Sequence, residues 1–196
     1  MSVALGCASV PEGPTGPLPV YVWPPGGLAD PAPLRVVVLP FVDETGHPAE
    51  AARLEEAFLA ALVESGRFEV IPHTASSAEF ASGGTRRSGR SRVEPLLALS
   101  LRHGAGGALY GTVTQLRPYG EPLVGLHVEL ISTVTGDVLW SARGVLDGSV
   151  ENTVRHLRLY HEREVATAPG QEDFESLRRS LTRFFTFAAD VFVATL

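Results

Sequence analysis

The chain has 196 residues and a formal net charge of −6, with 44% hydrophobic and 19% charged residues. This acidic balance argues against nucleic acid as a partner, because phosphate binding relies on clustered positive charge. All 16 Lys and Arg residues are arginines and there is one cysteine, so a P-loop lysine, a lysine nucleophile or base, an internal disulfide and a multi-thiolate metal site are excluded.

The cysteine, Cys7, ends the small, apolar run VALGC at residues 3–7. This run resembles the lipobox of bacterial lipoproteins, in which the thiol is diacylated and anchors the protein. A secretory signal needs a charged region and an apolar stretch of about 7 to 15 residues, whereas six residues precede Cys7. We therefore predict that residues 1–7 are a truncated signal with Cys7 as the lipidation site; the alternative is a chance cysteine at the terminus.

Residues 8–33 are crowded with proline and glycine and carry almost no charge. Proline fixes φ and removes a backbone donor, so this stretch is predicted to form neither a helix nor a central strand. As a polyproline II tether at about 3.1 Å per residue, it would span on the order of 80 Å. The alternative is a wrapped arm, in which Tyr21, Val22 and Trp23 dock on the domain or on a neighbouring copy.

The domain is predicted to start with a βαβ unit. Residues 34–41 form a short, β-branched apolar run typical of a strand buried on both faces. Residues 49–64 have helical periodicity, and residues 67–71 alternate as a second strand. Between the first strand and the helix, Asp43 and Glu44 are either paired carboxylates at a strand end or, more commonly, turn and capping residues.

The stretch 73–92 is rich in Ser, Gly and Arg, and we predict a long loop. It holds the dense positive patch of the chain, formed by Arg86, Arg87, Arg90 and Arg92. Such a patch could contact an anionic polymer, lipid headgroups or an acidic face of a neighbouring subunit. The default interpretation is a solvated loop.

The remaining elements are a helix at 93–102, a strand at 108–117, a hairpin at 123–134 and 137–146, and two C-terminal helical pieces. The second piece has the stronger apolar stripe, made of Leu177, Leu181, Phe184, Phe185, Ala188 and Phe192. We predict an α/β fold, a single domain at residues 34–196 with a mixed sheet in the order β-α-β-α-β-β-β-α-α, preceded by the Pro-rich N-terminal tether.

Signals for catalysis and metal binding are absent from the sequence. No two histidines stand at i, i+3 or i+4, so no helical zinc site is predicted. The glycines at 104–107 follow a helix and precede a strand, the reverse of a phosphate-binding loop. We predict no catalytic residue, no metal and no cofactor.

Four motifs in order resemble the periplasmic α/β domain of the CsgG, PelC, LpoB and TolB N-terminal-like family. They are VVVLPFVDETG at 36–46, LVESGRFEVI at 62–71, GGALYGTV at 106–113 and TGDVLW at 135–140. The resemblance implies a non-enzymatic assembly protein, lipid-anchored, that acts by binding partners and often by forming rings.

The function predicted from these observations is a lipid-anchored subunit of a polysaccharide or protein export complex at the periplasmic face of the outer membrane. We expect a homo-oligomer that binds the membrane through its anchor and binds another envelope protein. The alternative is a regulatory binding module that activates a cell-wall synthase. A small enzyme lacks any positive sequence signal.

Overall fold

The computed structural model describes residues 16–28, 34–72, 93–167 and 173–196. Its centre is a seven-stranded mixed sheet in the order β1-β7-β6-β5-β2-β4, with β3 paired to β5. The strands are β1 (Val20–Trp23), β2 (Leu34–Val38), β3 (Val42–Asp43), β4 (Phe68–Pro72), β5 (Gly107–Arg117), β6 (Leu123–Ser132) and β7 (Val138–Asp147). The helices are α1 (Pro48–Glu64), α3 (Val93–His103), α4 (Glu151–Thr167), α5 (Phe174–Arg179) and α6 (Leu181–Val193).

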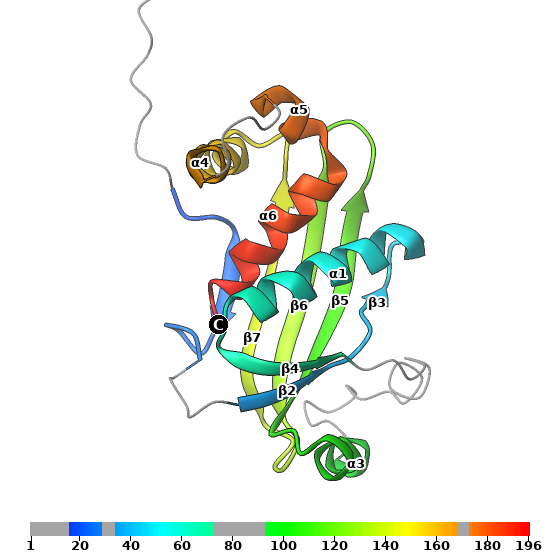
Figure 1. Cartoon of the computed structure of the whole chain (residues 1–196). Helices are drawn as coiled ribbons and strands as arrows, with labels where there is room; N and C mark the ends of the chain where they lie inside the picture. Colours follow the sequence, from blue (N-terminus) through cyan, green and yellow to red (C-terminus); the bar gives the residue numbers. More distant parts are fainter. Residues whose placement is uncertain (1–15, 29–33, 73–92, 168–172) are drawn as a thin grey trace, which may run out of the picture.

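One face of the sheet, called here the inner face, is covered by α1 and α6, which cross the long strands side by side (Figure 1). The apolar stripe predicted for the C-terminal helix is buried there, with Phe184, Phe185 and Phe192 at most 1% exposed. Trp140 of β7 and Phe58 of α1 are fully buried in the same cluster. Burial of this apolar surface is the main favourable term in folding.

The predicted βαβ unit is confirmed, because β2 and β4 pair in parallel around α1. The prediction that the first strand is buried on both faces is also correct. Val36 and Val38 belong to the inner cluster, whereas Val37 and Leu39 belong to a second, smaller cluster on the opposite face.

The opposite, outer face is covered at one end by α3. Leu96 of α3 packs there against Ala108 of β5 and Ile131 of β6. The rest of this face carries alternate side chains of β5, β6 and β7, which are partly exposed. The half-buried hairpin predicted from alternation at 123–146 is therefore present.

The sheet contains a strand that the composition did not predict. Within the stretch predicted as a tether, β1 pairs antiparallel with the edge of β7, from Val20 opposite Gly144 to Trp23 opposite Ser141. A Cβ at Gly144 would lie 2.4 Å from the carbonyl oxygen of Pro19, so glycine allows this close approach. Of the two interpretations of the Pro-rich stretch, tether and wrapped arm, the wrapped arm describes residues 16–28. Strand β1 lies at the edge of the sheet, where flanking prolines are tolerated.

Two further details differ from the expected element order. The two-residue strand β3 was not predicted, and the second C-terminal helical piece is divided into α5 and α6 at Ser180. Ser180 has extended backbone angles and its side chain accepts a hydrogen bond from the N–H of Arg183, as an N-cap does. Among the described residues, no helix combines the length and apolar character needed to cross a membrane.

Candidate partner-binding surfaces

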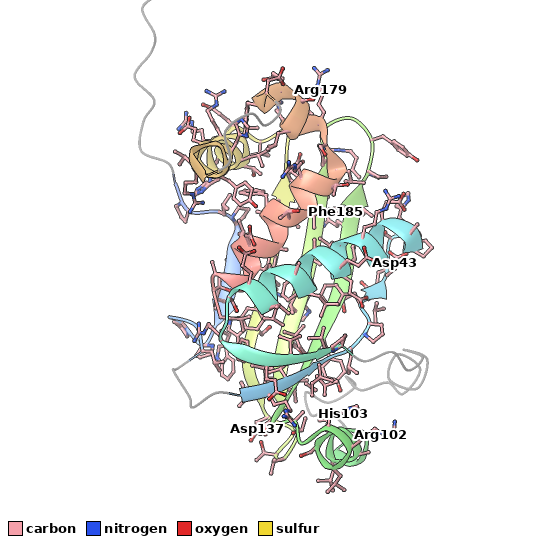
Figure 2. All side chains as sticks on the ribbon, viewed as in Figure 1. Asp43, Arg102, His103, Asp137, Arg179 and Phe185 are labelled. Atoms are coloured by element: carbon pink, nitrogen blue, oxygen red, sulfur yellow. The ribbon has the colours of Figure 1, made fainter. Side chains whose placement is uncertain are left out.

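Asp43, one of the two candidate carboxylates, is a turn residue (Figure 2). Its Oδ1 accepts hydrogen bonds from the backbone N of Thr45 at 2.8 Å and from the Thr45 hydroxyl at 2.7 Å. These bonds, led by that from the hydroxyl, lower the pKa of Asp43 against the opposing effect of burial. Glu44 is exposed, and its backbone N donates to Val113 O at 3.1 Å. The geometry matches the turn interpretation, and the segment is tied to the middle of β5.

Glu55 of α1 is a half-buried carboxylate that the sequence analysis missed. It accepts a hydrogen bond of 2.8 Å from the backbone N of Phe41, where the chain leaves β2. Burial raises the pKa of Glu55, and the Phe41 bond opposes this shift. The carboxylate fastens the β2–β3 connection to α1, so its role is structural.

The N-terminal arm, residues 16–28, is held at both ends. At its start, Nε2 of His156 lies 2.9 Å from Gly16 O, and the amide of Asn152 donates to Pro17 O at 3.0 Å. At its end, the backbone N of Leu28 donates to Leu196 O at 3.1 Å. Helix α4 and the C-terminal residues thus fix the path of the arm along the sheet edge.

A groove of about 1070 Å³ lies between α1, α4 and α6. Its apolar lining includes Tyr160, Phe187 and Leu159, and Leu159 is 47% exposed. Acidic side chains at the groove come from all three helices, with Glu64, Glu162 and Asp190, while Arg163 and His156 add basic groups. An apolar lining with charged groups around it resembles the apolar core and polar rim of protein interfaces.

The predicted site residues are only partly covered by the structure. Cys7 and the arginines Arg86, Arg87, Arg90 and Arg92 lie outside the described residues. In the part that is described, no group of three His, Cys, Asp or Glu side chains is placed to hold a metal ion. His156 contacts the arm, and the ring of His161 lies 6.0 Å from that of Phe174, measured between centroids.

Comparison with known proteins rests on structure. No family model matches the chain, and no curated protein matches its sequence. A PelC dodecamer from Paraburkholderia phytofirmans is 23% identical, with a TM-score of 0.50 over 68% of this chain and 85% of that chain. The lipoprotein GNA1162 from Neisseria meningitidis is 20% identical, with a TM-score of 0.44 over 70% of this chain and 99% of that chain.

A third solved structure with a similar fold is that of LpoB from E. coli, with 19% identity and a TM-score of 0.39 over 75% of this chain and 79% of that chain. PelC and LpoB are two of the proteins that the four sequence motifs resemble. At 23% identity the likeness to PelC establishes the fold alone: the chain has the same α/β fold as PelC.

Proposed function

We propose that this protein is a lipid-anchored, non-enzymatic subunit of an export complex, held at the periplasmic face of the outer membrane and active as a homo-oligomer. The fold of a protein that forms a dodecamer, PelC, supports an assembly role. The lipobox-like run ending at Cys7 supports the anchor. The main structural observation in support of the proposal is the docked arm, residues 16–28, because it limits the distance between Cys7 and the folded body.

The docked arm shortens the tether. Because Gly16 already contacts α4 through His156, only nine peptide bonds separate Cys7 from the folded body. At no more than about 3.6 Å per residue, this link reaches on the order of 30 Å, against the 80 Å of a fully extended tether. A body held this close to the bilayer suits an assembly at the membrane surface better than a regulator that must reach a distant synthase.

We further propose that the groove between α1, α4 and α6 receives a neighbouring copy. Head-to-tail rings need two different surfaces on each subunit, one of which is a receptor for the other. The groove offers exposed apolar area at Leu159 beside charged side chains. His156 both lines the groove and contacts Gly16, so the proposed contact would lie near the end of the arm that leads towards Cys7.

Light scattering of the full-length protein in detergent tests this assembly. We expect a mass of several subunits, and we expect Leu159→Arg to return it to a monomer because a charge would be buried against Tyr160 and Phe187. Leu101→Arg is the matched control, since Leu101 is 80% exposed and its helix, α3, lies at the opposite end of the sheet from α4 (Figure 1). A wild-type protein that stays monomeric at high concentration would contradict the assembly role.

A further inference from the structure

The outer face of the sheet carries two rows of side chains that run across four strands in register. The first row is Tyr21, Arg143, His127 and Thr112, and the second is Trp23, Ser141, Glu129 and Tyr110. Each row begins with an aromatic residue on the edge strand β1 and continues with hydrogen-bonding side chains on β7 and β6. We call these eight residues the aromatic–polar strip.

The two aromatic residues on β1 are open to solvent. Tyr21 is 71% exposed and Trp23 is 55% exposed. They stand two residues apart on one strand, so their side chains leave the same face about 7 Å from each other. The guanidinium of Arg143 lies 6.0 Å from the centroid of the Tyr21 ring, a cation–π contact that fixes the ring beside the next strand.

The polar groups of the strip are held in place as well. Nε2 of His127 lies 3.3 Å from the Ser141 hydroxyl and 3.2 Å from Oε1 of Glu129. The side chains of His127 and Glu129 are 28% and 13% exposed, so both are partly withdrawn from water. Their orientation is therefore set before any ligand arrives, which lowers the entropic cost of binding.

The strip has defined ends. On one side it meets the apolar cluster under α3, which Tyr110 joins. On the other side Arg117 and Asp147 form an ion pair of 2.7 Å across β5 and β7. In between, among the described residues, the exposed large hydrophobic side chains of this face are Tyr21 and Trp23.

We propose that the aromatic–polar strip binds a neutral glycan chain. The C–H faces of pyranose rings stack on flat aromatic side chains, and planar polar groups such as carboxylate, guanidinium and imidazole hydrogen-bond to adjacent hydroxyls. Arg143 and Glu129 contribute opposite charges, so the strip has no strong preference for an anionic or cationic polymer. A protein interface would instead have an apolar centre with a polar rim, whereas here the aromatic residues lie at the border and the centre is polar.

This binding activity goes beyond the assembly role and does not depend on it. The strip belongs to a single subunit and faces away from the groove between α1, α4 and α6. A monomer would carry it unchanged. If glycan binding were disproved, the assembly proposal would therefore still stand. If the protein proved to be a monomer, the glycan-binding proposal would likewise still stand.

The chain provides its own probe for a test. It has two tryptophans, of which Trp23 is exposed and Trp140 is fully buried with its Nε1 donating to Thr195 O. We would titrate the full-length protein in detergent with cellohexaose and with the hexamer of N-acetylglucosamine and follow tryptophan fluorescence and acrylamide quenching. Binding should shift the Trp23 emission and protect it from quenching, and the signal should disappear in Trp23→Phe.

Calorimetry with the same two hexamers then compares variants. Tyr21→Ala and Trp23→Ala should each weaken binding about tenfold. Tyr119→Ala should bind as the wild type does, because Tyr119 is 81% exposed but lies in the β5–β6 connection, outside the strip. Arg143→Gln is a second variant that leaves β1 intact while removing the contact with Tyr21, and it should also weaken binding.

Two results would overturn the proposal. One is no binding of either hexamer, or binding that Trp23→Ala and Arg143→Gln leave unchanged. The other is a Trp23→Ala variant that loses subunit mass in light scattering without any change in glycan binding, which would make the strip a protein interface.

Discussion

The inner face of the sheet is packed with fully buried aromatic and aliphatic side chains under α1 and α6. The outer face, in contrast, has a small apolar cluster under α3 and the aromatic–polar strip beside it. The same strands serve both faces, because successive side chains on a strand point in opposite directions. Residues that build the core therefore alternate along each strand with residues of the outer face. The difference teaches that one sheet can be stabilised through one face while its other face, under our proposal, serves recognition.

The largest effect is expected on the inner face. Phe184→Ala removes a fully buried ring that lies 5.9 Å from the Phe187 ring. We expect a loss of about 3 to 5 kcal/mol in the free energy of unfolding, measured by urea denaturation. Tyr21→Ala on the outer face should change it by less than about 1 kcal/mol. Similar losses of unfolding free energy in Phe184→Ala and Tyr21→Ala would contradict the distinction between the two faces.

A smaller loss is expected in the cluster under α3. Leu96 is fully buried there, and Leu96→Ala should cost about 2 to 3 kcal/mol. Leu101→Ala in the same helix is the control, because Leu101 is 80% exposed and its replacement should change stability by no more than about 0.5 kcal/mol. If Leu96→Ala were as mild as Leu101→Ala, α3 would not close this end of the outer face.

The docking of the arm is tested at Gly144. A Cβ at this position would lie 2.4 Å from Pro19 O and 3.0 Å from Val20 Cα. Gly144→Ala should therefore destabilise the protein by about 1 to 3 kcal/mol. It should also raise hydrogen exchange of the backbone amides at 20–23, while Ser141→Ala in the same strand should leave that exchange low. Unchanged exchange in Gly144→Ala would mean that β1 does not depend on this close approach.

The smallest effect concerns Glu55 and pH. Its pKa is raised by burial in the folded protein, so the folded state holds the Glu55 proton more tightly than the unfolded state. The contribution of Glu55 to stability is thus present below its ordinary pKa and is lost as pH rises through the raised value. Thermal unfolding between pH 4 and 7 should show wild type losing stability relative to Glu55→Gln as pH increases, and parallel curves would contradict this.

Much of the fold could be predicted from local patterns. The apolar stripe of α6, the fully apolar run at β2 and the alternation in β6 each report burial through their own periodicity. For α4 the pattern is less informative: Leu157 is fully buried, whereas Val150, the residue before the helix, is 49% exposed. Sequence periodicity is decisive where a helix is buried and weak where it lies at the margin.

The remaining features depend on contacts between distant residues. Docking of β1 requires the edge of β7 and the absence of a side chain at Gly144, about 120 positions further along the chain. The proline content of the arm argues against a strand, so composition alone does not predict this pairing. Glu55 lies off the apolar stripe of its helix, and its partner is the backbone N of Phe41, a group present in almost any residue. The aromatic–polar strip exists only through the register of four strands. An exposed Tyr-x-Trp on an edge strand was the available signal, and the sequence analysis noted it as a possible docking segment.

The claim on which the account depends is that Cys7 anchors the body close to a membrane. Intact-mass spectrometry of the natural protein, extracted from cell membranes, tests it most directly. We predict a mature chain whose first residue is Cys7 and which carries acyl chains. A protein recovered from the soluble fraction with an unmodified cysteine would contradict the account.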